Sequence, residues 1–207
     1  MQSTAFHIAA GSKWRDALFL CQVFLCVTIC ASAQKASGDM VNGRKDGAWT
    51  YYFDNGKVSA VEHFKDGLLD GTVEYFYPEG GRQGVEIWRK GVMEDTARYF
   101  HRNGSVEKVG RYEGGQYAGE WRHYFANGKP ERIVRYLNGL PDGNTKAFYE
   151  SGVLMQDGFY KAGKEDGEWK FYSEEGELRF IGIYKEGKEI SMKRVRPSRG
   201  SPRGERR

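Results

Sequence analysis

The sequence predicts an all-β protein, namely an elongated single-layer antiparallel sheet of about six β-hairpin repeats, each 24 residues long. Three observations support this prediction. Glycine returns every 24 residues, aromatic residues return at the same interval, and the repeats lack the apolar spacing of a helix. Self-similarity at a fixed period of this length is the signature of a repeat architecture. The repeats extend over residues 39–190, which leaves no room for a second folded domain.

Three series of glycines, each advancing by 24 residues, mark the repeats. They fill 17 of 18 expected positions, against 18 × 28/207, or about 2.4, by chance, so the period is not accidental. The break is Asp95, in the series that otherwise holds Gly47, Gly71, Gly119, Gly143 and Gly167. The other two series are the expected turn glycines: Gly56, Gly80, Gly104, Gly128, Gly152 and Gly176, and Gly67, Gly91, Gly115, Gly139, Gly163 and Gly187.

The first repeat shows how each unit is expected to fold. Residues 49–53, Trp-Thr-Tyr-Tyr-Phe, favour a strand and are too few for a helix. Asp54-Asn55-Gly56 then predicts a hairpin turn, in which Asn and Gly are expected to tolerate a positive φ. Residues 58–64 form the returning strand. Asp66-Gly67 closes the unit and leads into the next one.

Two aromatic columns are expected to form ladders along the sheet, because successive strand residues point to opposite faces. Neighbouring repeats should bury each other's rings in these ladders. The first ladder is Tyr52, Phe76, Phe100, Tyr124, Phe148 and Tyr172, and the second is Phe64, Trp88, Tyr112, Tyr136, Tyr160 and Tyr184.

Further aromatic residues, on the first strand of several repeats, form a candidate binding face. Aromatic residues make up 14% of the chain, and a single-layer sheet cannot bury all of them. A flat aromatic surface binds sugars, peptides or proteins with little loss of entropy. The alternative is that these rings only complete the packing of the array. The candidates are Trp49, Tyr51, Tyr75, Tyr99, Trp121, Trp169 and Phe171.

The repeat resembles the MORN repeat, in particular its bacterial variant, whose pattern is close to D-G-x-W-x-x-Y-x-x-x-G-x(7)-Y-x-x-G. Residues 46–67 carry the pattern through Asp46, Gly47, Trp49, Tyr52, Gly56, Phe64 and Gly67, and residues 166–187 repeat it. The resemblance covers residues 39–189 and implies a twisted sheet of successive hairpins. Bacterial proteins of this kind are often labelled YwqK-like antitoxins. The resemblance therefore implies an alternative function, in which the chain neutralises a partner toxin by direct binding.

The N-terminal segment predicts export. Lys13 and Arg15 precede the apolar residues 17–29, and Ala31-Ser32-Ala33 provides a small-residue cleavage site, as in a secretory signal peptide. Thirteen residues at about 1.5 Å each fall short of a hydrocarbon core about 30 Å thick. Cys30 is a weaker candidate for lipid attachment, because Ile29 precedes it. We expect residues 1–33 to be removed near Ala33 and the mature protein to be periplasmic or secreted.

The charge of the chain is unevenly distributed. The net charge is +4, but Met192–Arg207 contributes +6 (seven basic residues, one acidic) and residues 1–33 contribute +1, so the repeats carry 4 − 6 − 1 = −3. The segment 191–207 is expected to be a disordered basic tail. It is either a solvated end or a contact with an anionic membrane surface or polymer. If the protein is exported, nucleic acid is disfavoured as its partner.

The sequence predicts no catalytic, metal or cofactor site. All three cysteines lie in residues 1–33, so a mature chain would have no thiol for catalysis or metal binding. No histidines are paired at metal-ligand spacing. Acids that precede glycines at the strand connections are expected to cap backbone amides; they are Asp46, Asp70, Asp142 and Asp166. We therefore expect a non-catalytic exported scaffold that binds a protein or an envelope polymer through its aromatic face.

Overall fold

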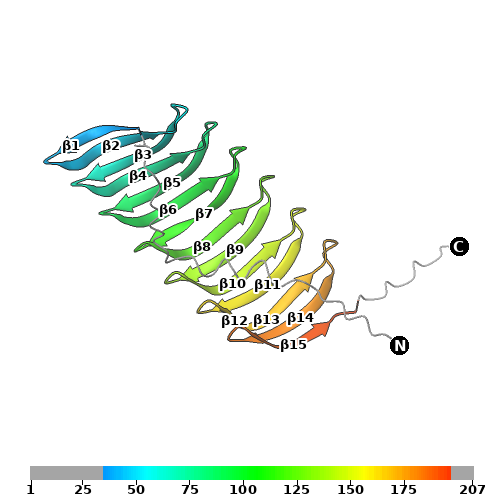
Figure 1. Cartoon of the computed structure of the whole chain (residues 1–207). Coiled ribbons are helices and arrows are strands. Elements are labelled where there is room, and N and C mark those ends of the chain that lie inside the picture. The colour runs from blue at the N-terminus through cyan, green and yellow to red at the C-terminus, as the bar shows by residue number, and fades with distance from the viewer. Residues whose placement is uncertain (1–34, 197–207) are drawn as a thin grey trace, which may run out of the picture. The chain divides into compact units, whose positions relative to one another are not determined.

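A computed structural model describes residues 35–196, and these residues form a single antiparallel sheet of fifteen strands without a helix. The order of strands in the sheet follows the order in the chain, except that β12 lies off this path and pairs with β11 (Figure 1). The predicted all-β, single-layer hairpin array is confirmed. The expected signal peptide lies outside the described residues, as does most of the basic tail.

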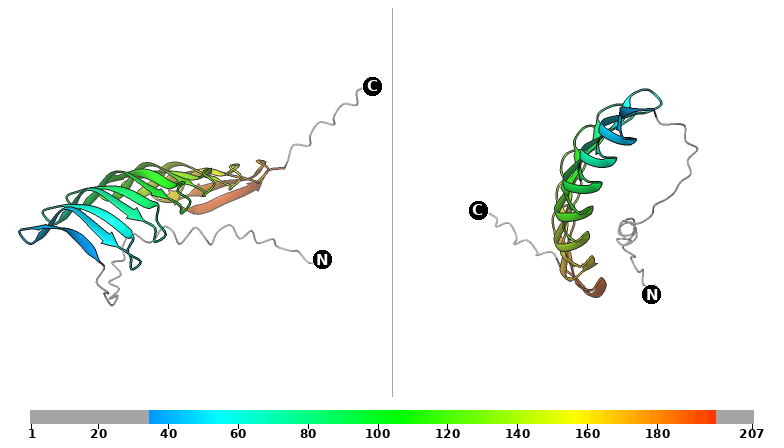
Figure 2. Two further views of the ribbon diagram at one scale, coloured as in Figure 1. Left: turned by 90° about the horizontal axis from the view of Figure 1, so that it is seen from above. Right: turned by 90° about the vertical axis from the view of Figure 1, so that its left-hand side faces the viewer.

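The strands are short and regular, and successive strands are joined by short turns. Figure 2 shows that the sheet is bowed along its length. The strands are β1 (Ala36–Val41), β2 (Arg44–Tyr52), β3 (Val58–Lys65), β4 (Leu68–Phe76), β5 (Arg82–Arg89), β6 (Val92–Phe100), β7 (Val106–Glu113), β8 (Gln116–Tyr124), β9 (Pro130–Leu137), β10 (Leu140–Phe148), β11 (Leu154–Lys161), β12 (Lys164–Glu165), β13 (Gly167–Tyr172), β14 (Leu178–Lys185) and β15 (Lys188–Arg194).

Two kinds of turn alternate along the chain. The connection from β3 to β4 is a two-residue turn in which Asp66 and Gly67 have φ values of 52° and 83°. Two positive φ values are the mark of a type I′ hairpin, whose twist matches that of the strands. The connection from β2 to β3 is longer, and it closes through a 2.9 Å hydrogen bond from the Gly56 amide to the Phe53 carbonyl.

The expectation that Asn55 needs a positive φ is wrong. In that turn only Gly56 has a positive φ, of 81°. Asn55 acts through its side chain instead, because its Oδ1 accepts a 3.0 Å hydrogen bond from the Lys57 amide. Its Nδ2 donates a 2.9 Å bond to the carbonyl of Pro78 in the corresponding turn of the next repeat. Asparagine therefore links neighbouring turns as well as closing its own.

The core lies on one face of the sheet, which we call the aromatic face. Cross-strand pairing carries this face straight across the array, as in Trp49 to Glu62 to Val73. The largest fully buried side chains are Trp121 and Val73. All the buried hydrophobic residues belong to this face: Ala60, Val73, Ala97, Tyr112, Trp121, Val134 and Trp169. The opposite face carries the intervening residues, among them Arg98, Arg122, Lys146 and Lys170.

Both expected aromatic ladders consist of rings that are at least half-buried, and Tyr112 is the most buried of them. By strand alternation they lie on opposite faces, with the Phe64 column on the aromatic face. The Phe64 column packs against the tryptophans. Tyr112 lies 5.1 Å from Trp121 and Tyr160 lies 5.1 Å from Trp169, measured between ring centroids.

The sheet is longer than residues 39–190 at both ends. It begins with β1 at Ala36 and ends with β15 at Arg194. Residues 191–194, expected in the disordered tail, therefore lie in a strand. The physical reason is that Ile181 pairs with Lys193, and Phe180 with Arg194, through backbone groups that do not depend on side-chain charge. Among residues 35–196 no helix is long and apolar enough to span a bilayer.

Candidate binding face

Trp121 is buried because the preceding strand provides a glycine beneath it. A Cβ atom built on Gly110 would lie 2.1 Å from Cδ2 of Trp121, so the indole lies directly on the backbone. The indole N–H also donates a 3.0 Å hydrogen bond to the carbonyl of Arg111. Gly158 lies beneath Trp169 in the same way, at 2.2 Å, and Gly38 lies beneath Trp49, at 2.5 Å.

The repeats without tryptophan at the position equivalent to Trp121 also lack this glycine. Val73 stands opposite Glu62, and Thr145 stands opposite Val134. A large residue on one strand is therefore matched by glycine on the strand before it, and a smaller residue is matched by a larger neighbour. This complementarity of size keeps the interior filled without voids. Sequence reasoning missed it, although a glycine stands eleven residues before each of Trp49, Trp121 and Trp169 in the sequence.

Two of the candidate contact residues are not accessible. Trp121 is 0% exposed and Trp169 is 5% exposed, so they pack within the array and cannot form a contact surface. Trp49 is half-buried. The Trp169 indole N–H is buried without a hydrogen-bond partner, unlike that of Trp121. The corresponding carbonyl, that of Phe159, accepts a 3.0 Å bond from the Asp166 amide at the break between β12 and β13.

Of the remaining candidates, all but Trp49 belong to one straight line of residues, which we call the contact row. Each member pairs directly with the next across adjacent strands, over about 50 Å at roughly 4.8 Å per strand. Tyr51, Tyr75, Tyr99 and Phe171, all half-buried, are members. In order from β2 to β14, the contact row is Tyr51, Ala60, Tyr75, Gly84, Tyr99, Lys108, His123, Arg132, Ala147, Gln156, Phe171 and Phe180.

A buried carboxylate holds the tyrosines at one end of the contact row. Glu86, 6% exposed, accepts hydrogen bonds from the hydroxyls of Tyr75 (3.2 Å) and Tyr99 (2.6 Å) and from the indole of Trp88 (3.0 Å). Burial, and then Glu86, raises the pKa of Tyr75 and of Tyr99 above the usual value for tyrosine. Both hydroxyls stay protonated and hydrogen-bonded to Glu86. The part of each residue that remains for a partner is therefore its ring.

The middle of the contact row is basic, which sequence reasoning also missed. Lys108, His123 and Arg132, which we call the basic triad, stand side by side on β7, β8 and β9. Lys108 Nζ lies 4.3 Å from the centroid of the Tyr99 ring, a cation–π contact. Burial lowers the pKa of His123 to about 4, with further lowering by the positive charges of Arg132 and Lys108.

Stability should therefore depend on pH through His123. Its pKa is about 4 in the folded protein, against an ordinary value of 6.5, so the unfolded chain binds more protons between these values. The free energy of unfolding should fall as the pH is lowered from 6.5 towards 4. His123→Gln should reduce this dependence. Urea denaturation of both proteins at several pH values in this range measures it, and parallel curves would contradict the prediction.

The acids that precede glycines do cap backbone amides, as the sequence predicts. Asp142 Oδ2 accepts a 3.0 Å hydrogen bond from the Ala162 amide, twenty residues later in the next two-residue turn. Asp46, Asp70 and Asp166 do the same at 3.3, 3.3 and 3.5 Å. In the third repeat Glu94 takes over this role, with a 3.0 Å bond from the Gly114 amide. These acids have structural roles.

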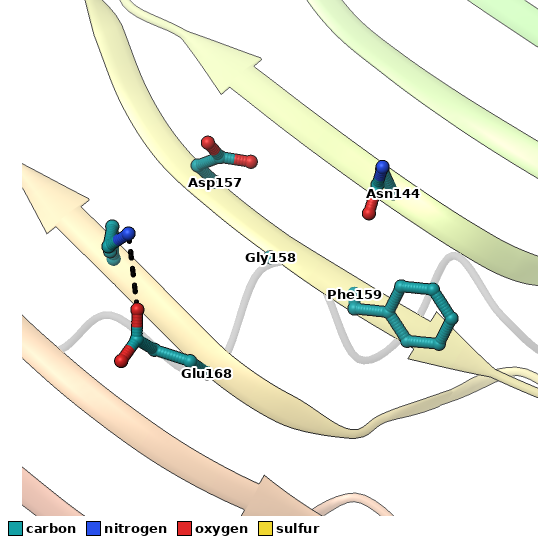
Figure 3. Close-up of a pocket in the computed structure, with 6 residues that line it drawn as sticks. Asn144, Asp157, Gly158, Phe159 and Glu168 are labelled. Carbon is teal, nitrogen blue, oxygen red and sulfur yellow. Dashed lines mark ion pairs between the residues drawn. The ribbon is translucent and has the colours of Figure 1, made fainter.

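The opposite face has a shallow hollow between β10, β11 and β13 (Figure 3). Its lining includes an ion pair of 3.1 Å between Lys170 and Glu168. Asp157 stands directly across from Lys170, so the lining holds two acidic side chains and one basic side chain. Within residues 35–196, no three His, Cys, Asp or Glu side chains are grouped as metal ligands.

Four segments of the chain match the family model described as the MORN repeat variant: residues 45–66, 118–138, 141–162 and 165–186. These four segments are similar to the MORN repeat variant. They include the repeats that contain Trp49, Trp121 and Trp169. Residues 67–117 are unmatched, and there Val73 and Ala97 replace tryptophan and Asp95 replaces glycine.

No curated protein matches the chain. Among solved structures it is similar to a chain of the crystal structure of the GtfA/B complex bound to UDP and GlcNAc, at 11% identity and a TM-score of 0.27. That match covers 61% of this chain and 24% of the other, so this chain spans about a quarter of the length of the other. At this TM-score the likeness supports no conclusion about function.

Proposed function

We propose that the MORN-variant array is a non-catalytic scaffold that binds a protein partner through the contact row. The observation that carries this proposal is the straight line of residues, half-buried except for the buried Ala60 and Gly84, that crosses the sheet from Tyr51 to Phe180. Residues 35–196 form a single sheet, so within them no second layer covers the row. Aromatic rings on a firm backbone provide contact area at a low cost in entropy.

The row is rigid for a physical reason. The neighbouring line of side chains is fully buried at Val73, Ala97 and Trp121, which are 0% exposed. Glu86 fixes Tyr75 and Tyr99 through their hydroxyls. A binding surface that is ordered before the partner arrives loses little conformational freedom on binding.

Site-specific photo-cross-linking tests this function. Gln156 or Phe171 in the contact row is replaced by p-benzoylphenylalanine, and Lys146 on the opposite face is the matched control. Irradiation of producing cells is expected to give a discrete adduct from positions 156 and 171 and none from position 146. Equal adducts from both faces, or none from the contact row, would contradict the proposal. An adduct with a polysaccharide would identify an envelope polymer as the partner instead.

We also propose that the protein is exported, on the basis of the signal-like residues 13–33. Residues 1–40 fused to alkaline phosphatase, which is active only outside the cytosol, should give an active reporter. An inactive, cytosolic reporter would overturn export. It would favour the antitoxin alternative, because an antitoxin must meet its toxin where the toxin is made.

A further inference from the structure

We propose that copies of this chain associate head to tail, with β15 of one copy pairing with β1 of the next. This inference goes beyond the binding function of a single array, and it names a second copy as the occupant of each end of the sheet. β1 and β15 are the two ends of the strand order (Figure 1). Within residues 35–196 neither strand has a neighbour on its outer side, so its outward backbone groups form an open edge.

The array begins and ends halfway through a repeat. Each repeat consists of a first strand, a turn and a second strand. By the 24-residue period, β1 corresponds to a second strand, as β3 is, and β15 corresponds to a first strand, as β2 is. Every first strand inside the array is followed by a second strand, as β2 is by β3 and β13 is by β14. Two copies joined end to end therefore complete one repeat.

Met192 on β15 shows what the missing strand would cover. It pairs with Gly182, which pairs with Trp169, so Met192 continues the buried line of the aromatic face. A Cβ atom on Gly182 would lie 3.1 Å from Cε of Met192, which therefore lies over this glycine. Trp169 has a strand on each side and is 5% exposed, whereas Met192 is 41% exposed. A strand placed against β15 would cover this side chain.

The repeat period predicts how the two strands would align. Trp169 pairs with Gly182, and Met192 occupies the position of the tryptophan in β15. Gly38 stands six periods before Gly182 in the sequence. Met192 of one copy should therefore pair with Gly38 of the next.

This alignment brings two exposed methionines together. Inside the array Tyr184 packs against the outer side of Trp169, with 6.1 Å between their ring centroids. Met40 of β1 stands six periods before Tyr184, and it is 56% exposed. It would be the diagonal neighbour of Met192 across the junction, a distance at which long side chains interact. The joined ends thus bury apolar surface that each end exposes alone.

Charge and strand type disfavour the symmetric alternatives. β15 has three basic residues and one acidic residue, a net charge of +2, so two β15 edges would repel each other. Residues 35–41 have one of each and no net charge, and the alignment sets Lys193 diagonal to Asp39. Two β1 edges would pair one second strand with another, which occurs nowhere in the described sheet. Pairing of β15 with β1 is the arrangement that the array already uses.

Head-to-tail pairing would join the contact rows of successive copies. Phe180, at the end of the contact row, pairs with Arg194, and Tyr51, at its beginning, pairs with Ala36. The alignment places Arg194 of one copy opposite Ala36 of the next, so the row continues across the junction. Because each copy offers two different edges, the assembly stays open to further copies. One strand pair is a small interface, so we expect association only at high protein concentration.

Proline can block each edge separately. Lys35 accepts a backbone hydrogen bond from β2, and Val195 donates one to β14, so by alternation the amides of Ala36 and Arg194 point outward. Proline is tolerated on an edge strand where the amide faces solvent. Ala36→Pro should therefore block β1, and Arg194→Pro should block β15. Arg194→Ala is the matched control, because it removes the same side chain and keeps the outward amide.

The test is sedimentation equilibrium of the full chain, as isolated from producing cells, at increasing concentration. The unaltered protein should form dimers and then larger species. Each proline variant alone should stay monomeric, but an equimolar mixture of the two should form a dimer and nothing larger, because one free β15 edge and one free β1 edge remain. Arg194→Ala should associate at least tenfold more tightly than Arg194→Pro. Circular dichroism establishes that the variants are folded.

The same measurements can overturn the inference. Dimers of Arg194→Pro alone would show pairing of two β1 edges, and dimers of Ala36→Pro alone would show pairing of two β15 edges. An unaltered protein that stays monomeric at millimolar concentration would exclude pairing at the ends. The contact-row cross-links at positions 156 and 171 do not depend on these edges, so the scaffold function and the head-to-tail assembly can fail separately.

A cross-link that does not depend on proline provides a second measurement. The alignment places Lys193 of one copy opposite Ser37 of the next. Replacement of Lys193 by p-benzoylphenylalanine should give, on irradiation, an adduct of two chains that maps to residues 35–41. An adduct that joins two β15 strands, or no adduct between chains, would contradict the proposed pairing.

Discussion

Trp121→Ala is expected to lower the free energy of unfolding by about 3–5 kcal/mol. Trp121 is 0% exposed, and its ring packs against Tyr112 at 5.1 Å and Tyr117 at 4.2 Å. Removing the indole leaves a cavity above Gly110 and removes the hydrogen bond to the Arg111 carbonyl. The surrounding backbone belongs to a hydrogen-bonded sheet, so it cannot collapse to fill the space. Urea denaturation followed by circular dichroism gives the loss.

Trp49→Ala is the matched control for this prediction. Trp49 packs on Gly38 in the same way, but it is half-buried and lies at the first repeat. Repeat arrays fray at their ends, so a loss there is confined to the terminal strands. We expect a clearly smaller change in global stability. A loss as large as that of Trp121→Ala would mean that burial at the centre of the array does not determine its stability.

Gly110→Ala is expected to destabilise the array by about 1–3 kcal/mol or more, because it overpacks the same contact from the other side. The new Cβ would lie 2.1 Å from Cδ2 and 2.3 Å from Cε2 of Trp121, closer than any Cβ contact allows. The φ of Gly110 is not positive, so the cost arises from the collision and not from backbone strain. The indole must therefore move, or β7 must separate from β8.

The double variant Gly110→Ala/Trp121→Ala gives the decisive comparison. Since alanine at position 121 removes the collision, the combined loss should be smaller than the sum of the two single losses. Gly84→Ala is the matched control, because its Cβ would meet Tyr99 Cδ1 at 3.0 Å, a milder contact. Additive losses, or an equal loss at Gly84, would refute the size complementarity between tryptophan and the preceding glycine.

This complementarity also explains which aromatic residues are left for binding. Trp121 and Trp169 lie over glycine and are covered by tyrosines from adjacent strands, so they stabilise the array. The tyrosines of the contact row have only alanine or glycine between them, at Ala60 and Gly84, and remain half-buried. The array thus separates a line of side chains that holds the strands together from a parallel line that is available to a partner.

The 24-residue period, the turn residues and the aromatic columns were sufficient to predict the all-β array, its hairpins and its acid caps. These features depend on local chemistry. A two-residue turn with positive φ needs a residue such as Gly67, and a short run of aromatic residues by itself favours a strand. The ends of the sheet were less predictable, because β15 is held by backbone pairing with β14 despite its basic side chains.

Tertiary structure alone decided which rings are accessible and where charge gathers. The burial of Trp121 depends on Gly110 on another strand, and their contact is set by the alignment of two strands. In the basic triad, Lys108 and Arg132 are equivalent positions one repeat apart, and cross-strand pairing places His123, from a different position of the repeat, between them. A repeat period relates equivalent positions in different units, whereas cross-strand register relates different positions in adjacent strands. The contact row depends on cross-strand register, which is a property of the folded sheet.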